Sequence, residues 1–284
     1  MGEHVDIFEV GPRDGLQNEP GIIPAADKIA LIDRLSCCGF SRIEVASFVS
    51  PKRVPQMADG AEVLAGIRRA QDVAYCALTP NMQGYQGAIA ANADEIAIFA
   101  SASEAFSKAN INCTIDESLE RFTPVAQAAR AIRKPMRGYV SCVTDCPYEG
   151  PVDPAATARV AEALARLGCY GISLGDTIGK GTPETISGML EAVLDVVPAR
   201  RLAGHYHDTG GTALDNIAVS LDLGLRVFDA AVAGLGGCPY APGAPGNVAT
   251  DAVVSLVGRR GFETGIDIFR LARATEFAKR FTHG

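Results

Sequence analysis

Residues 202–223 read LAGHYHDTGGTALDNIAVSLDL: a short apolar run, a Gly-rich connection and a longer stretch with helical spacing. The apolar run predicts a buried strand, and the spacing of apolar residues in the second half predicts a helix. Residues two apart in a strand point to the same face, so His205 and His207 should project side by side. The stretch therefore predicts one β/α unit whose strand ends in two imidazoles.

The same alternation recurs along the whole chain. We expect strands at residues 5–10, 42–46, 73–78, 95–99, 138–142, 171–174, 202–207 and 227–231. We expect helices at residues 25–38, 60–70, 83–91, 115–132, 154–167, 183–197, 211–223 and 248–257, and a final one at 267–280. Eight β/α units in about 250 residues predict a single-domain α/β protein over residues 1–284, a (β/α)8 TIM barrel. The extra C-terminal helix is expected to cover an end or serve a subunit contact.

A doubly wound open sheet is the alternative fold. Such a sheet normally carries a Gly-rich phosphate-binding sequence after its first strand. Here that position holds GPRDG at residues 11–15, which does not match the glycine spacing of a dinucleotide site. The closed barrel is therefore the favoured prediction.

Composition restricts the partners and the compartment. Hydrophobic residues make up 48% of the chain and charged residues 21%, as in ordinary globular proteins. A formal net charge of -7 argues against a nucleic-acid partner, which needs a basic face. No apolar run approaches the roughly 20 residues that cross a membrane, and strand-like sequence begins almost at the first residue, where a cleavable signal would stand. We expect a cytoplasmic protein with reduced cysteines that binds neither nucleic acid nor a membrane.

Polar residues gather where the predicted strands end. Barrel enzymes place their active sites at the C-terminal ends of the strands. Along the chain, the residues at these ends are Glu9, Arg13 and Asp14; Glu44 and Ser47; Arg137, Tyr139 and Ser141; Ser173 and Asp176; His205 and His207; and Cys238 and Asn247 in a loop rich in Gly and Pro. Acids, imidazoles, an amide and a thiol should therefore meet at one mouth of the barrel, and the last loop has the composition of a lid.

Four of these residues form a mixed oxygen and nitrogen ligand set: Asp14, His205, His207 and Asn247. Such a set suits a six-coordinate divalent ion that keeps positions open for substrate or water. Carboxylate and amide ligands favour Mg²⁺ or Mn²⁺, while two imidazoles also admit Co²⁺, Zn²⁺ or Fe²⁺. The alternative is a pair of buried, hydrogen-bonded histidines without a metal. Arg13 is a permanent cation suited to a developing oxyanion, its alternative being a surface ion pair.

Six motifs resemble one known family. They are VGPRDGLQN at 10–18, SFVSPK at 47–52, GYVSC at 138–142, SLGDTIG at 173–179, HYHDT at 205–209, and VAGLGGCPY at 232–240 with Gly-Asn at 246–247. Long and in order, they closely resemble the 3-hydroxy-3-methylglutaryl-CoA lyases, a family of barrel metallolyases, from residue 9 to about residue 251. The resemblance is specific because the motifs cover nearly the whole chain.

The resemblance implies a retro-aldol (Claisen-type) cleavage of a 3-hydroxy-3-methylglutaryl thioester to acetyl-CoA and acetoacetate. A metal on the four ligands would bind the tertiary hydroxyl and lower its pKa. A nearby base would remove that proton, with Asp176 as the first choice and His205 as the rival. Arg13 would face the thioester oxygen, where enolate charge gathers.

Further roles and partners also follow from the resemblance. Cys238 would deliver a proton to the enolate carbon, an incidental thiol being the alternative. Glu44 and Glu9 would orient Arg13 or the metal-bound groups. The partner would be an acyl-CoA thioester and the assembly a homodimer. The residues expected to contact the substrate are Gln17, Asn18, Ser47, Lys52, Asn110, Arg137, Tyr139, Ser141, Ser173 and Thr177.

Two departures from the family pattern leave the substrate open. Residues 210–212 read Gly-Gly-Thr where the family commonly has Tyr-Gly-Gln, and Asp251 stands where Glu is usual. Either change could reshape the acyl pocket for a related 3-hydroxy-3-substituted acyl-CoA, such as a citramalyl-like or longer branched thioester. Two other function classes are a synthase that condenses acetyl-CoA with a 2-oxo acid and a noncatalytic binding barrel. The synthases usually carry a C-terminal extension, and a binding barrel has no use for this set of groups.

Overall fold

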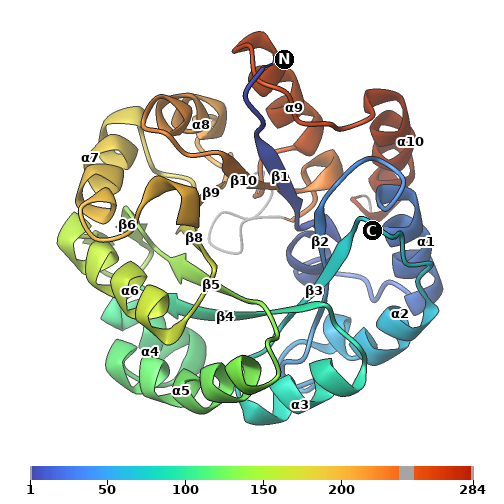
Figure 1. The fold of residues 1–284 in the computed structure, drawn as a ribbon, viewed down its shortest axis with the longest axis horizontal. Helices are drawn as coiled ribbons and strands as arrows, with labels where there is room; N and C mark the ends of the chain where they lie inside the picture. Colours follow the sequence, from blue (N-terminus) through green and yellow to red (C-terminus); the bar gives the residue numbers. More distant parts are fainter. Residues whose placement is uncertain (1, 237–245, 283–284) are drawn as a thin grey trace.

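A closed ring of parallel strands forms the centre of the protein (Figure 1). The structure is a computed structural model that describes residues 2–236 and 246–282. Its eight barrel strands follow the order β1-β10-β9-β8-β5-β4-β3-β2. Their bounds are Asp6–Glu9 (β1), Arg42–Ser47 (β2), Ala74–Leu78 (β3), Glu95–Ser101 (β4), Met136–Ser141 (β5), Gly171–Asp176 (β8), Leu202–Tyr206 (β9) and Val227–Ala230 (β10). The TIM barrel is confirmed, and the open sheet is not the fold.

Helices surround the ring of strands (Figure 1). They are α1 (Ala25–Leu35), α2 (Gly60–Gly66), α3 (Met82–Ala90), α4 (Glu104–Ile111), α5 (Ile115–Ala131), α6 (Pro154–Leu167), α7 (Pro183–Leu194), α8 (Ala213–Asp222), α9 (Thr250–Arg259) and α10 (Ile268–Ala278). The additional helix α10 packs beside α1 on the outside of the ring. It therefore extends the outer layer of helices. It does not cover an end of the barrel, which was one of its two expected roles.

Capping side chains begin several helices where the sequence predicts. Asp153 accepts a hydrogen bond from the backbone N–H of Ala155 at the start of α6, and Thr182 forms a capping box with Thr185 at the start of α7. The sequence interpretation missed α4, which is short and follows the N-cap Ser103. It also missed the hairpin of β6 (Asp145–Cys146) and β7 (Gly150–Pro151) in the connection between β5 and α6.

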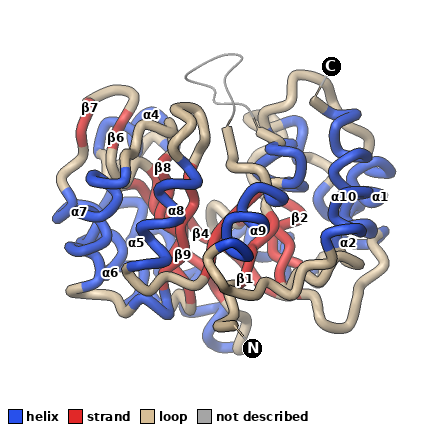
Figure 2. The backbone as a smooth tube through the Cα atoms, turned by 90° about the horizontal axis from the view of Figure 1, so that it is seen from above, coloured by secondary structure: helices blue, strands red, loops and turns tan. Residues whose placement is uncertain are grey.

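The two ends of the barrel differ in what they carry. Each strand runs from the end that holds the N-terminus toward the end where the β6–β7 hairpin lies (Figure 2). The short π-helical turn η1 (Gly11–Gly15) and the connections from strands into helices therefore gather at the second end, which we call the mouth. The four predicted metal ligands and Arg13 lie at this mouth.

Candidate active site and metal centre

Three of the four predicted metal ligands lie together at the mouth. One potential ligand atom from each of Asp14, His205 and His207 lies within 4.8 Å of the others. Nε2 of His205 is 3.9 Å from Oδ2 of Asp14. Asp14 comes from η1 after β1, and the histidines come from the end of β9, so the closing of the barrel brings together residues about 190 positions apart. The same-face projection predicted for the histidines is compatible with this geometry.

Asn247, the fourth predicted ligand, joins the other three. Its side-chain Nδ2 donates to Oδ2 of Asp14 at 2.9 Å and to the carbonyl oxygen of Leu235 at 3.2 Å. Its backbone forms a bridge with His207. Asn247 is 5% exposed. Its amide therefore lines the site, where Asp14 and Leu235 hold it in place.

The donor atoms of the cluster fit a divalent ion. Among the described residues, Nδ1 of His207 is buried without a hydrogen-bond partner, an arrangement that is costly unless a ligand fills it. Burial, followed by the charge of His205, lowers the pKa of His207 to about 4, so its imidazole is neutral at pH 7. Burial opposes ionisation of Asp14, but the charge of Arg13, then those of the histidines, hold the pKa of Asp14 well below its usual range. The cluster therefore offers a carboxylate and neutral imidazole nitrogen, as a divalent ion requires.

Asp229 was missed by the sequence interpretation and lies directly behind His205. Its Oδ2 is 3.1 Å from Nδ1 of His205, its Oδ1 accepts from Arg137 at 2.5 Å, and its Oδ2 also accepts from Ser173 at 2.7 Å. With Nδ1 bonded to the carboxylate, Nε2 of His205 is the nitrogen left to face Asp14. The signal in the sequence was an acid within the apolar strand Val227–Ala230.

Arg13 is buried between two carboxylates. Its Nε and Nη2 bind Oε2 of Glu44 at 2.6 and 2.5 Å, and its Nη1 binds Oδ1 of Asp14 at 2.5 Å. Burial favours the neutral guanidine, but the charges of Glu44 and Asp14 outweigh it and raise the pKa of Arg13. At 5% exposure, Arg13 is not the surface ion pair considered as its alternative.

The two glutamates have different partners. Glu44 binds Arg13 directly, as the resemblance implied for it. Glu9 instead accepts hydrogen bonds from the backbone N–H groups of Gly11 and Val232 at 2.8 and 2.9 Å and from the hydroxyl of Thr250 at 2.7 Å. Glu9 thus connects the backbone of the turn that carries Arg13 with the segment after β10. Its expected role in orienting Arg13 or the metal-bound groups stays a prediction.

Asp176 points away from the metal cluster. In β8 the hydroxyl of Ser173 reaches Asp229 inside the barrel, so the alternation of side chains turns Asp176 to the outer face. There its carboxylate accepts the backbone N–H groups of Lys180 at 3.2 Å and Gly181 at 2.8 Å. Burial raises its pKa to about 6. The prediction of Asp176 as the base does not fit this geometry, because the carboxylate anchors the connection into α7.

The residues expected to contact the substrate lie in several environments. Gln17 is half-buried after η1, while Asn18, Lys52 and Asn110 are exposed, the last of them on α4. Ser47 is buried at the end of β2, and among the described residues its hydroxyl has no hydrogen-bond partner. A free buried hydroxyl beside the mouth is consistent with a ligand contact.

Other expected contacts are used within the protein. Arg137 is 2% exposed near the start of β5, where it pairs with Asp229 and stacks 3.9 Å from the ring centre of Phe8. It and Ser173 support Asp229, so a contact with substrate does not fit their position. Thr177 accepts the backbone N–H of Cys142 at 2.8 Å. Ser141 is half-buried at the end of β5.

Tyr139 lies in the barrel interior between the two arginines. The guanidinium carbon of Arg13 is 5.7 Å from its ring centre and that of Arg137 is 5.2 Å away. Its hydroxyl is buried and has no hydrogen-bond partner within the described part of the chain. Cys238, the predicted proton donor, lies outside the described residues.

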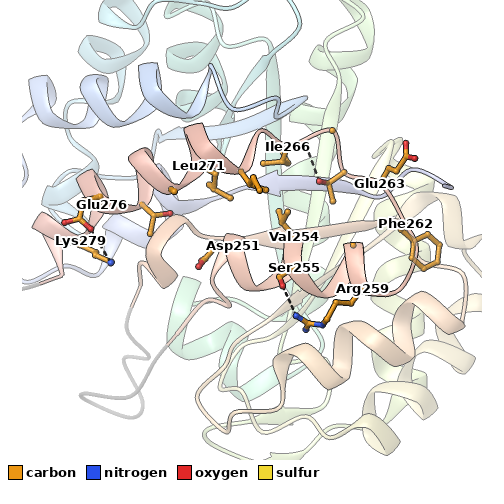
Figure 3. Close-up of a pocket in the computed structure, with 16 residues that line it drawn as sticks. Asp251, Val254, Ser255, Arg259, Phe262, Glu263, Ile266, Leu271, Glu276 and Lys279 are labelled. Carbon is orange, nitrogen blue, oxygen red and sulfur yellow. Dashed lines mark hydrogen bonds and ion pairs between the residues drawn. The ribbon is translucent and has the colours of Figure 1, made fainter. Parts of the chain in front are cut away.

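A groove of about 920 Å³ lies on the outside of the barrel between α9 and α10 (Figure 3). Val254 and Leu271 line it, together with Asp251, which replaces the usual Glu of the family. None of the predicted ligands or substrate contacts lines this groove. It is therefore separate from the histidine cluster, and Asp251 faces it.

Comparison with known proteins shows the family of the chain. The model of the family described as HMGL-like matches residues 4–278. The chain belongs to the HMGL-like family. Among its HMGL-like relatives, the 3-hydroxy-3-isohexenylglutaryl-CoA/hydroxy-methylglutaryl-CoA lyase of Pseudomonas aeruginosa is 56% identical over 274 residues, which cover 96% of this chain and 91% of the relative.

Solved structures of HMGL-like proteins have the same fold. The HMG-CoA lyase of Brucella melitensis matches with a TM-score of 0.99 and 63% identity over 99% of this chain and 100% of its own. An HMG-CoA lyase of Acinetobacter baumannii, solved in complex with coenzyme A and 3-methylmalate, matches with a TM-score of 0.92 and 38% identity over 98% of this chain and 91% of its own. The resemblance found in the sequence motifs is thereby confirmed.

Proposed function

We propose that this protein is a metal-dependent carbon–carbon lyase that cleaves 3-hydroxy-3-methylglutaryl-CoA to acetyl-CoA and acetoacetate. The observation that carries the proposal is the cluster of Asp14, His205 and His207 beside the buried Arg13 at the barrel mouth, in a chain of the HMGL-like family. The close relatives carry this activity in their names. The proposed substrate class is an acyl-CoA thioester.

The proposed cofactor is Mg²⁺ or Mn²⁺, held by Asp14, His205, His207 and Asn247. Oxygen ligands from a carboxylate and an amide favour these two ions over softer metals. When bound, such an ion polarises the tertiary hydroxyl of the substrate and lowers its pKa. The unpartnered Nδ1 of His207 supports a metal at this site, whichever divalent ion is bound.

Arg13 is proposed to stabilise the enolate at the thioester oxygen. A guanidinium has five N–H groups, and Glu44 and Asp14 occupy three of them. The other two remain for an oxyanion in a buried setting where charge is weakly screened. The pair with Glu44 holds the guanidinium plane in place, so little reorientation is needed when charge develops.

His205 is the proposed base, because Asp176 anchors a loop on the outer face of β8. Burial opposes protonation of His205, but the hydrogen bond to Nδ1 and the charge of Asp229 outweigh it and raise the pKa of His205. One nitrogen cannot hold a metal and a proton at the same time, so the base and ligand roles of His205 are alternatives in any one complex. Cys238 remains the proposed donor of a proton to the enolate carbon.

A longer branched acyl group is a second candidate substrate. The relative from Pseudomonas aeruginosa carries 3-hydroxy-3-isohexenylglutaryl-CoA in its name. In this chain Gly210 stands where the family commonly has Tyr, and it is exposed in the turn after β9. The absent ring would leave room for a larger substituent at carbon 3.

The homodimer and the cytoplasmic location are also proposals. The dimer rests on the family resemblance, and the compartment rests on the sequence composition. Within the described ranges, no helix is long and apolar enough to span a bilayer.

The function is tested by product analysis. The purified protein, loaded with Mg²⁺ or Mn²⁺, is incubated with 3-hydroxy-3-methylglutaryl-CoA, the isohexenyl analogue and a citramalyl thioester, and products are identified by mass spectrometry. From 3-hydroxy-3-methylglutaryl-CoA we expect acetyl-CoA and acetoacetate, and this activity should be lost on chelation and restored by metal. His207→Ala should abolish activity, while His4→Ala, at the opposite end of the barrel, should not. Failure of every thioester to be cleaved would refute the proposal.

A further inference from the structure

Lys28 is a buried cation outside the metal site. It lies in the first turns of α1 and is 2% exposed. Lysine is almost never buried unless it is paired. Its Nζ donates to both carboxylate oxygens of Asp59 at 2.8 Å and to the backbone carbonyl of Gln56. The first turn of α1 faces the mouth, because each helix of the barrel runs back from the C-terminal end of its strand.

Gln56 extends this contact to another loop. Its side-chain oxygen accepts the backbone N–H of Ile23 at 2.9 Å, and its side-chain nitrogen donates to the carbonyl of Gly21 at 2.7 Å. Gln56 is 4% exposed, so these bonds are shielded from water. We call Lys28, Gln56 and Asp59 the lysine clamp.

The clamp joins two loops that bear predicted substrate contacts. Residues 16–24 follow η1 and include Gln17 and Asn18, and residues 48–54 follow β2 and include Lys52. The clamp holds the far end of the first loop against the far end of the second. Arg13 in η1 and Glu44 in β2, the elements that precede the two loops, are joined at 2.6 Å. The two loops are therefore held together on both sides. The Arg13–Glu44 pair is part of the candidate active site, and the lysine clamp lies outside it.

We propose that the lysine clamp is a positioning device that sets these two loops for the acyl-CoA substrate. The inference rests on the proposed lyase function and deepens it. A buried ion pair is weak evidence for stability, since replacing it by apolar groups is often neutral. Holding substrate-contacting loops is a role that a matched apolar pair would not perform, because only the cation reaches both Asp59 and the Gln56 carbonyl.

Two variants separate the parts of the clamp. Lys28→Met removes the cation at similar volume. Gln56→Met leaves the Lys28–Asp59 pair in place and removes the side-chain bonds to Ile23, Gly21 and Glu19, all in the first loop. Lys134→Met is the matched control, because Lys134 also donates to a backbone carbonyl, that of Ala93 at 2.7 Å, but just before β5 begins, at the end opposite the mouth.

Steady-state kinetics of the metal-loaded enzyme give the first readout. We expect both clamp variants to raise KM for the thioester about tenfold or more, with kcat within about threefold of wild type, since misplaced binding loops lose substrate affinity. Lys134→Met should leave KM unchanged even if it lowers Tm. An unchanged KM in a folded Gln56→Met protein would overturn the proposal, because a merely structural clamp changes Tm alone.

Amide hydrogen exchange gives a second readout that needs no turnover. The Ile23 amide should exchange faster in both clamp variants and at the wild-type rate in Lys134→Met. Equal Ile23 exchange in Gln56→Met and wild type would also overturn the proposal. If the wild type cleaved no thioester, the proposed function would fail. The positioning role of the clamp would then be tested by Ile23 exchange and by the Kd for coenzyme A.

Discussion

Oδ2 of Asp229 lies 3.1 Å from Nδ1 of His205, and Oδ1 of the same carboxylate binds Arg137 at 2.5 Å. The carboxylate thus links a cation deep in the barrel to a histidine at the mouth. All three residues are buried. In such surroundings the hydrogen bond at Nδ1 decides which ring nitrogen is free for a ligand.

Asp229→Asn is expected to weaken metal binding by about 10- to 100-fold. The amide can still offer its oxygen to Arg137, but its NH2 group then faces Nδ1 of His205 and favours the tautomer with the proton on Nε2. The affinity for Mn²⁺ can be measured by electron paramagnetic resonance. Ser173→Ala removes another bond to Oδ2 and serves as the control, with a smaller loss. Equal affinity in Asp229→Asn and wild type would show that the carboxylate does not orient the ligand.

Arg13→Gln should lower kcat far more than it raises KM. The proposed interaction strengthens only as enolate charge develops, so its loss is a loss of transition-state stabilisation. Arg13→Lys should rescue poorly, because an ammonium cannot make the paired bonds to Glu44 while also facing the substrate. Steady-state kinetics at saturating Mg²⁺ measure both constants. A change confined to KM would mean that Arg13 binds the ground state alone.

Glu9→Gln should stabilise the protein at alkaline pH. Burial raises the pKa of Glu9 from 4.5 to about 7, so the folded state favours its protonated form. The contribution of this proton to the free energy of unfolding is complete below pH 4.5 and is lost as pH rises through 7. A glutamine mimics the protonated form at every pH, and its amide can still serve Gly11, Val232 and Thr250. The gain is on the order of 3 kcal/mol at most.

Urea unfolding of the metal-free protein at pH 5 and pH 8 tests this prediction. The stability difference between Glu9→Gln and wild type should grow in favour of the variant between the two values. Replacement of the exposed Glu120 by Gln should show no such growth. A stability difference that is the same at both pH values would show that the pKa of Glu9 is not raised in the folded protein.

Cys238 is expected to react first with an alkylating reagent, and its modification should inactivate the enzyme. Its loop composition suggests that it is reachable, whereas six of the seven other cysteines are buried. A bound substrate analogue should protect it. Cys238→Ser should retain metal binding and lose most turnover, because a hydroxyl is a much weaker acid than a thiol. Wild-type turnover in Cys238→Ala would remove the thiol from the chemistry.

Much of the fold could be predicted from the chain alone. The eight strands and most helices follow local patterns of apolar spacing and capping, and the strand at Leu202–Tyr206 differs from its predicted range by one residue. Helix α4 escaped because it is short and its apolar spacing is weak. The likeness of the motifs to one family was also visible, since long ordered motifs need no coordinates.

The identity of the reactive groups was only partly predictable. The spacing of His205 and His207 indicates that they are ligands, and the position of Asp14 after the first strand indicates the same for Asp14. Whether Asp176 faces the cluster or the outer layer depends on which face of β8 turns inward, and that is set by the register of the closed barrel.

Sequence alone therefore determined the β/α order, the candidate ligands and the family, because these depend on local periodicity and on residue type. Only the tertiary structure decided that Asp229 supports His205, that Arg137 lies beneath the site, and that Lys28 fastens two loops through Gln56. These contacts join residues 24, 92 and 28 positions apart. Barrel closure brings such residues together, and no local pattern encodes which distant side chains will share a buried hydrogen bond.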